Sequence, residues 1–237
     1  MEAIILAGGQ ATRLGDAARG HPKALVPIAG HPLAEYQVSQ LVRAGVERVI
    51  VSCAAGQAAL FKAKLSGLGA EIVAVAEPEP LGRGGGLRFA AEQREETGPL
   101  YAVNGDELTD VDLRALLDAH EEHGGAATIV VAPLMSQFGV VELGEDERVT
   151  GFREAPRLPH LVNAGVYVLG EEALERMPER GDHEQSTFPE LAEEGKLFAF
   201  RHEGLWITVN TPKDLQRAEA HYAAHPELRP TLARGRT

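Results

Sequence analysis

The start of the chain combines small residues and cations in a way that suits a phosphate group. The apolar run Met1–Ala7 leads directly into Gly8 and Gly9, and Arg13 and Lys23 follow. Backbone N–H groups can approach an anion closely where side chains are small, and the two cations can neutralise charge that the backbone alone cannot. The alternative is an ordinary turn after a strand, but such a turn needs no cations. The segment therefore predicts a phosphate site.

The spacing of the glycines excludes the two common phosphate-binding loops. No stretch of the sequence supplies the Walker A pattern G-x-x-x-x-G-K-[ST]. Gly8, Gly9 and Gly15 are wrongly spaced for the dinucleotide pattern G-x-G-x-x-G. We therefore expect a phosphate loop of another kind.

A carboxylate follows another predicted strand. Asn104-Gly105-Asp106 comes directly after the apolar segment Tyr101–Val103. Mg²⁺ that is bound together with phosphates typically takes one or two protein carboxylates, which makes Asp106 a candidate Mg²⁺ ligand. The alternative role of such an Asp is to cap a turn or helix, but Asp110 is better placed to cap the helix that follows.

A second glycine cluster precedes a predicted helix that starts near Gly86. It contains Gly82, Gly84 and Gly85. In one interpretation the cluster is a flexible entry to the helix. In the other, its bare backbone lies flat against a planar base and ribose, and a positive helix N-terminus near phosphate would favour this second interpretation.

The overall composition excludes several classes of protein. The 237 residues carry a net charge of −12, which argues against a general nucleic-acid-binding or membrane-binding surface. The single cysteine, Cys53, excludes an intramolecular disulfide and a multi-cysteine zinc site, and its apolar neighbours indicate a buried thiol. Because neither a signal peptide nor a membrane-spanning run is visible, we expect a cytoplasmic protein.

Strand-like and helix-like segments alternate through the first half of the sequence. This alternation predicts a mostly parallel α/β sheet with helices on both faces, whose ligands lie beyond the carboxyl ends of the strands. The loops at Gly8 and Asp106 follow strands directly, so both belong at that edge. The expected strands are Ala3–Ala7, Arg48–Cys53, Glu71–Ala76 and Leu100–Val103, and the expected helices are Leu33–Ala44, Gly56–Leu65, Gly86–Arg94 and Val111–His123.

The second half predicts a β-rich addition packed on the same sheet. A helix over Thr211–Ala224 is expected to close the domain. The length suits one α/β domain over residues 1–224, with residues 225–237 as a frayed tail. The remaining expected strands are Thr128–Ala132, Phe138–Leu143, Arg148–Phe152, Val162–Leu169 and Leu197–Phe200, and short helices are expected at Leu174–Met177 and Phe188–Glu194.

Six motifs, in order, resemble those of the sugar-1-phosphate nucleotidyltransferases, also called NDP-sugar pyrophosphorylases. The resemblance covers residues 1 to about 220. It implies a single Rossmann-like α/β domain with a nucleotide-binding part over about 1–125 and a β-rich sugar-binding part over about 126–210. The motifs are Leu6-Ala7-Gly8-Gly9-x-x-Thr12-Arg13-Leu14 with Pro22-Lys23, Pro80-Leu81-Gly82-x-Gly84-Gly85, Asn104-Gly105-Asp106, Phe138-Gly139-Val140-Val141, Phe152-Arg153-Glu154 and Asn163-Ala164-Gly165-Val166-Tyr167.

The resemblance also implies a reaction, in which a sugar-1-phosphate oxygen attacks the α-phosphorus of a nucleoside triphosphate and pyrophosphate leaves. Catalysis would align two polyanions and stabilise charge in the transition state, with Mg²⁺ as cofactor. A homo-oligomer formed through this domain is left open. The implied roles are Arg13 on the triphosphate, Lys23 on phosphate oxygens, Asp106 on Mg²⁺, Leu6, Ala7, Gly8, Gly9, Gly82, Gly84 and Gly85 along the nucleotide, and Gly139, Glu154 and Asn163 on the sugar. For Glu154 and Asn163 the alternatives are a solvated turn residue and a satisfied strand end.

Two positions depart from the family pattern. Where members commonly read Glu-Lys-Pro, this chain has Glu154-Ala155-Pro156, so that position supplies no ammonium for the sugar phosphate. Where many members read Trp-x-Asp-x-Gly-Thr-Pro with the Asp as a second metal ligand, Thr208 replaces the Asp. Val209-Asn210 resembles segments of relatives in which an Asn oxygen completes the magnesium site, and this resemblance implies Asn210 as a candidate second Mg²⁺ ligand. Mg²⁺ accepts neutral oxygen donors, which is consistent with this role. Its alternative role is simply to precede the next helix.

Three functions remain open from the sequence. The favoured one is an enzyme that makes an NDP-sugar, with the second glycine cluster leaning toward mannose- or heptose-type guanylyltransferases. The second is a nucleotidyltransferase that acts on a non-sugar phosphate acceptor of the molybdenum-cofactor type, which Ala155 and Asn210 favour. The third is a catalytically silent nucleotide-sugar-binding domain, and the joint presence of Arg13, Lys23 and Asp106 speaks against it.

Overall fold

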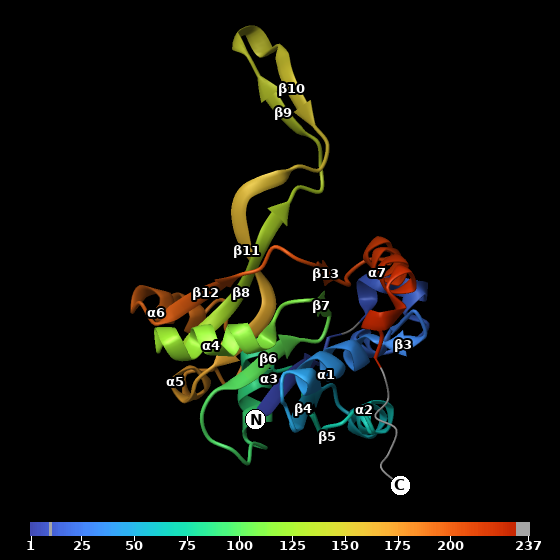
Figure 1. Ribbon diagram of the computed structural model, residues 1–237, viewed down its shortest axis with the longest axis vertical. Coiled ribbons are helices and arrows are strands. Elements are labelled where there is room, and N and C mark those ends of the chain that lie inside the picture. The colour runs from blue at the N-terminus through green and yellow to red at the C-terminus, as the bar shows by residue number, and fades with distance from the viewer. Residues whose placement is uncertain (10, 231–237) are drawn as a thin grey trace.

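The computed structural model describes residues 1–9 and 11–230 (Figure 1). At its centre lies a seven-stranded sheet with the order β12-β8-β11-β6-β1-β4-β5. The strands of this sheet are β1 (Glu2–Ala7), β4 (Arg48–Cys53), β5 (Glu71–Ala76), β6 (Leu100–Asn104), β8 (Ala127–Met135), β11 (Arg157–Leu169) and β12 (Leu197–Arg201). Separate strand pairs are β2 (Pro27–Ile28) with β3 (His31–Pro32), β7 (Glu107–Thr109) with β13 (Trp206–Thr208), and β9 (Val140–Leu143) with β10 (Val149–Arg153). The helices are α1 (Leu33–Arg43), α2 (Ala58–Leu65), α3 (Gly82–Ala91), α4 (Leu113–His123), α5 (Glu171–Glu175), α6 (Thr187–Glu193) and α7 (Pro212–Ala224), with short 3₁₀ helices η1 (Thr12–Ala18), η2 (Lys23–Leu25), η3 (Glu145–Glu147) and η4 (Pro226–Leu228).

The part of the sheet that comes from the first half of the chain is parallel. β1 pairs in parallel with β4 and β6, and Leu6 of β1 lies opposite Asn104 of β6. The loops after β1 and β6 therefore begin side by side at one edge of the sheet. β11 is antiparallel to both of its neighbours, whereas β12 is parallel to β8. The prediction of a mostly parallel α/β sheet is confirmed.

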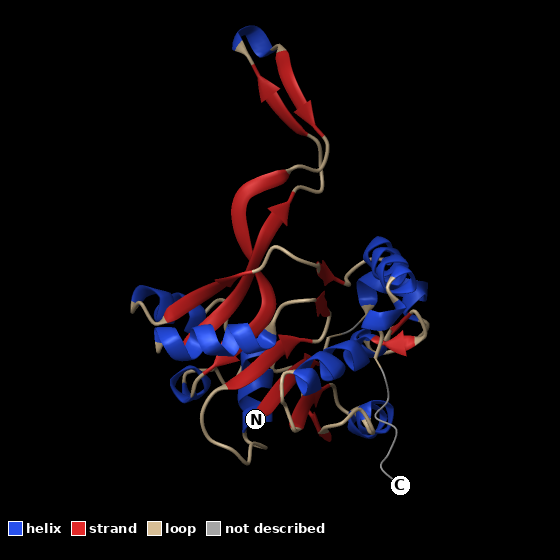
Figure 2. Ribbon diagram, viewed as in Figure 1, coloured by secondary structure: helices blue, strands red, loops and turns tan. Residues whose placement is uncertain are grey.

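Alternating side chains of the strands build an apolar layer on each face of the sheet. Helices cover both faces (Figure 2). Ile5 belongs to the layer covered by α1, α2 and α4, and its neighbour Ile4 belongs to the layer covered by α3, α5 and α6. Successive residues of a strand point to opposite faces, and both isoleucines are fully buried. Helices on both faces follow from this alternation, as predicted.

Several helices begin at positions other than those predicted, among them α2 at Ala58 instead of Gly56 and α5 at Glu171 instead of Leu174, and two such differences concern the site. α3 starts at Gly82 instead of Gly86, so the second glycine cluster forms the first turn of a helix and not a loop. α4 is capped by Asp112, whose carboxylate accepts hydrogen bonds from two backbone N–H groups of the first turn at 3.0 and 3.1 Å. The expected cap, Asp110, lies too early in the chain and accepts a hydrogen bond from the Leu205 N–H instead (2.7 Å).

The hairpin β9–β10 projects from the body of the molecule (Figure 1). The sequence predicted that the strands of the second half pack on one sheet. β8, β11 and β12 do join the central sheet, but β9 and β10 pair only with each other. Strand propensity does not say which sheet a strand joins, and this prediction was wrong for the hairpin.

The C-terminal part of the described chain packs on α7. The helix follows Thr211, which forms a capping box with Asp214 and so confirms the predicted start. After η4, Arg229 Nε donates a hydrogen bond to the backbone oxygen of Tyr222 (2.7 Å). The predicted tail begins within these contacts, and its last residues, 231–237, lie outside the described residues.

Candidate active site

Four side chains from distant parts of the chain meet where β1 and β6 end. Lys23 Nζ forms an ion pair with Asp106 Oδ2 and donates a hydrogen bond to Asn210 Oδ1 (2.6 Å). Arg13 Nη2 donates to the same oxygen of Asn210 (2.9 Å). Arg13 lies on η1, Lys23 begins η2, Asp106 follows β6 and Asn210 precedes α7. The structure therefore brings together every residue predicted as catalytic or as a metal ligand.

A cavity of about 580 Å³ lies against this cluster. Its walls come from the loops after β1, β4, β5 and β6, which is the edge where open α/β sheets bind ligands. Of the predicted nucleotide contacts, Leu6, Ala7, Gly8, Gly9 and Gly82 line it. The other lining residues are Arg13, Lys23, Ala24, Ala54, Ala55, Glu77, Pro78, Glu79, Pro80, Arg83, Asn104, Gly105, Asp106 and Asp182.

Gly105 allows Asp106 to lie against β1. Its backbone N–H donates a hydrogen bond to the Leu6 carbonyl oxygen (2.9 Å), and a Cβ at this position would lie 2.5 Å from the same oxygen. Any side chain at position 105 would push the loop away from β1. The motif Asn104-Gly105-Asp106 therefore needs its glycine for steric reasons. Only a residue without a side chain lets the loop lie against β1, where the Asp106 carboxylate contacts Lys23.

Glu77 is a cavity residue that sequence reasoning missed. It follows β5 and is only 7% exposed. Its Oε1 accepts a hydrogen bond from Ser52 Oγ (2.8 Å), and its Oε2 accepts one from the Leu81 N–H (3.1 Å). A Cβ on Gly8 would lie 3.1 Å from Oε1, so the first glycine loop packs directly on this carboxylate. The sequence feature that could have identified Glu77 is its position directly after a predicted strand. Asp106 was identified from the same kind of position.

Gly84 and Gly85 lie away from the cavity surface, although both were predicted to line the nucleotide. Both are buried, and their N–H groups donate to the Gly181 carbonyl oxygen at 2.9 and 3.2 Å. A Cβ on Gly84 would lie 2.7 Å from Pro178 Cγ, and one on Gly85 would lie 2.7 Å from the Glu179 oxygen. These positions need glycine because the segment 178–184 packs on the first turn of α3. Their predicted contact with a nucleotide gains no support from this placement.

The same segment brings an ion-pair cluster to the cavity. Asp182, which lines the cavity, accepts hydrogen bonds from the backbone N–H (3.0 Å) and the Nε (3.5 Å) of Arg83. Arg83 Nη1 also lies 3.1 Å from Glu184 Oε1. The hydrogen bonds from Arg83 hold the pKa of Asp182 below its ordinary value, whereas burial raises the pKa of Glu184. No local sequence pattern predicts this cluster, because Arg83 lies 99 positions before Asp182 in the chain.

We expect His183 to make stability depend on pH. Its fully buried ring lies edge-on to Tyr167 and Phe188, and neither ring nitrogen has a hydrogen-bond partner among the described residues. Burial lowers the pKa of His183 from 6.5 to about 4. Between these values the native protein binds fewer protons than the unfolded chain. The free energy of unfolding should therefore fall as the pH drops through this window, by at most about 1.4 kcal/mol per pH unit.

Urea unfolding at a series of pH values across that window would measure the slope. His183→Leu, which keeps an apolar side chain in the same place, should flatten it. The matched control is His160→Leu, because His160 is exposed on β11. A slope that is the same in wild type and His183→Leu would contradict the expectation.

The three predicted sugar-binding residues do not line the cavity, although Asn163 is connected through Tyr167 Oη to Asn104, which does line it. Gly139 and Glu154 face each other at the base of the β9–β10 hairpin, where a Cβ on Gly139 would lie 3.0 Å from Glu154 Oε2. Asn163 uses both ends of its amide, since Nδ2 donates to Tyr167 Oη (2.9 Å) and Oδ1 accepts from the Gly165 N–H (3.0 Å). None of the three predicted residues lines the cavity. Their contact with a sugar stays a prediction.

Glu107 is a buried carboxylate beside Asp106 that sequence reasoning also missed. Its Oε2 accepts hydrogen bonds from Trp206 Nε1 and Thr208 Oγ1, both at 2.8 Å, across the β7–β13 pair. Burial, with the neighbouring Asp106 charge as a second cause, raises the pKa of Glu107 to about 8. An Asp at position 208 would place a second carboxylate against that of Glu107, whereas the Thr208 hydroxyl donates a hydrogen bond to Glu107. The Glu107–Thr208 pair thus accounts for Thr208 at the position of the usual Asp.

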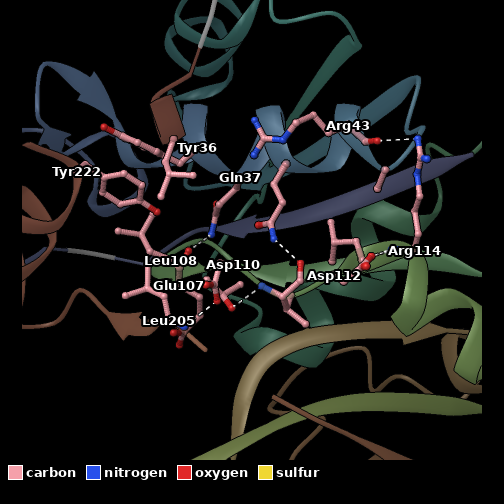
Figure 3. A pocket seen from close by; sticks show the side chains of 16 residues that line it. Tyr36, Gln37, Arg43, Glu107, Leu108, Asp110, Asp112, Arg114, Leu205 and Tyr222 are labelled. Atoms are coloured by element: carbon pink, nitrogen blue, oxygen red, sulfur yellow. Dashed lines mark hydrogen bonds between the residues drawn. The ribbon is translucent and has the colours of Figure 1, made fainter. Parts of the chain in front are cut away.

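A second cavity, of about 300 Å³, lies between α1, the β7–α4 loop and α7 (Figure 3). None of the four clustered side chains lines it. Its lining residue Gln37 donates through Nε2 to the backbone oxygen of Glu107 (Figure 3) and to that of Asn104, at 2.8 Å each. α1 thereby holds the backbone on both sides of Asp106. The larger cavity, which adjoins the four clustered side chains, is therefore the candidate active site.

The comparisons with known proteins establish the family. The family model described as nucleotidyl transferase matches residues 2–225. The mannose-1-phosphate guanylyltransferase catalytic subunit beta of Danio rerio is 35% identical over 224 residues, which cover 90% of this chain and 62% of that protein. The mannose-1-phosphate guanylyltransferase of Mycobacterium tuberculosis is 33% identical over 232 residues, which cover 93% and 64%. The chain belongs to the nucleotidyl transferase family, as its motifs predicted, and it spans a little under two thirds of the length of these two relatives.

Solved structures share the fold. HddC from Yersinia pseudotuberculosis superimposes with a TM-score of 0.74 at 24% identity, covering 93% of this chain and 99% of that one. A putative glucose-1-phosphate thymidylyltransferase from Bacillus anthracis superimposes with a TM-score of 0.75 at 18% identity, covering 93% and 94%. At these identities the likeness concerns the fold alone.

Proposed function

We propose that this protein joins a nucleoside triphosphate and a sugar-1-phosphate to form an NDP-sugar and pyrophosphate. The observation that carries the proposal is the meeting of Arg13, Lys23, Asp106 and Asn210 beside the cavity at the carboxyl edge of the sheet. The relatives at 33–35% identity are named mannose-1-phosphate guanylyltransferases, which favours GTP and mannose-1-phosphate as the substrates.

The proposed reaction forms a bond between a sugar-phosphate oxygen and the α-phosphorus, and breaks the bond from that phosphorus to the pyrophosphate oxygen. Both reactants are polyanions, so their mutual repulsion is the main obstacle. Lys23 is 13% exposed and would hold phosphate oxygens at the reacting centre. Arg13 is exposed and would contact the triphosphate and the departing pyrophosphate. Alignment and fixed positive charge lower the barrier without a covalent enzyme intermediate.

The donor set fits a Mg²⁺ ion, the cofactor that we propose. Asp106 Oδ2 and Asn210 Oδ1 both contact the ammonium of Lys23, so the two oxygens already face one cation. Among the described residues no group of three His, Cys, Asp or Glu side chains could hold a metal. Mg²⁺ that is bound with phosphates needs only one or two protein carboxylates. Asp106 and Asn210 would hold the ion, which would supply positive charge to the phosphates when bound.

The proposed substrates suggest where the protein works. Nucleoside triphosphates and sugar phosphates are charged cytoplasmic metabolites, and we place the protein in the cytoplasm with these small molecules as its partners. No helix among the described residues has both the length and the apolar character required to cross a membrane. The net charge of −12 argues against a nucleic acid as partner.

A second candidate function is nucleotidyl transfer to a phosphate acceptor other than a sugar. Two observations favour it. Ala155 supplies no ammonium, and Gly139, Glu154 and Asn163 are not among the residues that line the cavity. A third candidate is a nucleotide-sugar-binding domain without turnover, which would not need the cations and the carboxylate of the reacting centre together.

The test is release of pyrophosphate from each nucleoside triphosphate with Mg²⁺ and a panel of sugar-1-phosphates. We expect turnover with GTP and mannose-1-phosphate. Turnover only with another phosphorylated acceptor would support the second candidate instead. Binding of nucleotide without turnover on any acceptor would support the third, and either result would overturn the first proposal.

A further inference from the structure

Two of the four clustered side chains, Asp106 and Asn210, flank a very short strand pair. Asp106 comes directly before β7 and Asn210 comes two residues after β13, and these two strands form a two-stranded sheet of their own. Each strand has three residues. A two-stranded sheet by itself is at best marginally stable in water. The position of Asp106 relative to Asn210 therefore depends on further contacts across the pair.

The Glu107 side chain supplies two of these contacts. Glu107 lies opposite Thr208 in the register, and Trp206 lies two residues earlier on β13, so the side chains of Thr208 and Trp206 share one face. Both donate to the same oxygen, Oε2, at 2.8 Å. Glu107 is only 6% exposed, so water cannot easily replace either hydrogen bond. One carboxylate oxygen thus holds two positions of β13 against β7.

The strand pair continues directly into the candidate active site. The Val209 N–H donates a hydrogen bond to the backbone oxygen of Asp106 (2.8 Å). Asn210 is the next residue, and its Oδ1 accepts a hydrogen bond from Lys23 Nζ (2.6 Å), which also pairs with the Asp106 carboxylate. A shift of β13 along β7 would therefore move Asn210 relative to the ammonium that it shares with Asp106.

We propose that Glu107 is a positioning residue that sets the distance between Asp106 and Asn210 by holding β13 against β7. Glu107 does not line the larger cavity, so it acts through these two residues and not on a substrate. The inference rests on the proposed function, in which the oxygens of Asp106 and Asn210 act on the same bound cation. It also gives Thr208 a role, because a hydroxyl at position 208 can donate to Glu107 and an Asp carboxylate cannot.

Two substitutions of Glu107 separate position from charge. Glu107→Leu removes both hydrogen bonds and should lower the kcat of pyrophosphate release roughly 10- to 100-fold, because a misplacement of about 1 Å can have an effect of this size. Calorimetry with nucleotide present should show weaker Mg²⁺ binding in the same variant. Glu107→Gln should stay close to wild type in both measurements, because its amide oxygen can accept both hydrogen bonds. A Glu107→Gln variant as impaired as Glu107→Leu would overturn the proposal, since charge would then be responsible.

Thr208→Val tests the same contact from the other strand, including the case in which Glu107→Leu does not fold. It removes one donor and keeps the branched shape of the side chain, and it should weaken Mg²⁺ binding. The matched control is Thr128→Val, because Thr128 is fully buried on β8 and its hydroxyl lies 3.0 Å from His120 Nδ1. The control should lose stability and still bind Mg²⁺ as wild type does. Equal Mg²⁺ binding by Thr208→Val and the control would overturn the proposal.

The double variant, Glu107→Leu with Thr208→Val, shows whether the two residues act through one contact. Its loss of kcat should be smaller than the product of the two single losses, because the second substitution removes a hydrogen bond that is already broken. Losses that multiply would contradict the proposal. A wild type that turns over no sugar-1-phosphate would overturn the proposed function instead, and Mg²⁺ binding by the same variants would still decide the role of Glu107.

Discussion

Replacement of Lys23 by methionine is expected to lower turnover roughly 10²- to 10³-fold, the usual effect of removing one group that stabilises charge in a transition state. The substitution keeps most of the side-chain stem and removes only the ammonium. Among residues 1–9 and 11–230, that ammonium is the only side-chain group that donates to both Asp106 Oδ2 and Asn210 Oδ1. Without it, two highly charged reactants would meet at a centre that has lost its nearest cation.

Initial rates of pyrophosphate release in wild type and Lys23→Met would measure this effect. Thermal unfolding should show that the variant is still folded, because the ammonium lies at the cavity surface and not in the core. Lys62→Met is the matched control, since Lys62 is exposed on α2 and does not line the cavity. A rate close to wild type in Lys23→Met would remove Lys23 from the reacting centre.

Replacement of Asp106 by asparagine is expected to lower turnover roughly 10²-fold or more, since it removes the charged ligand while it keeps the shape of the side chain. The backbone at this position is held by Gly105 against β1 and by Gln37 from α1, so the loop should keep its place. The loss should therefore arise from charge and not from collapse of the site.

A titration of activity with Mg²⁺ would separate the two causes. Asp106→Asn should need a higher Mg²⁺ concentration for half-maximal rate, whereas Asp118→Asn, an exposed carboxylate on α4, should match wild type. Mg²⁺ binding measured by calorimetry in the presence of nucleotide gives a readout that does not depend on turnover. An unchanged metal requirement together with unchanged turnover would contradict the role assigned to Asp106.

Segments whose signal is local were predicted well from the sequence. The bounds predicted for Arg48–Cys53 and Glu71–Ala76 are those observed, because each is a short run of apolar residues between polar or glycine-containing turns. Their parallel pairing follows from the helices between them. The same rule predicts that the loops at Gly8 and Asp106 share an edge, which the β1–β6 register confirms.

Contacts between distant segments were not predictable in this way. The pairing of β7 with β13 joins residues that are 99 and 101 positions apart and holds Glu107 against Trp206 and Thr208. Each strand has only three residues, too few for a periodic pattern. The glycines of α3 are a similar case, because their small size is required by a segment about a hundred residues away.

Residue types and their order were enough to indicate an α/β domain, a phosphate-handling edge and the four side chains that converge there, because strand direction and motif order are local properties of the chain. Tertiary structure alone decided which glycines line the cavity, that Glu77 and Asp182 line it as well, that Glu107 is buried beside Asp106, and that the β9–β10 hairpin projects from the domain. Those outcomes depend on packing between segments that no neighbouring residue specifies. Only the folded chain brings such segments within the few ångströms over which sterics and charge act.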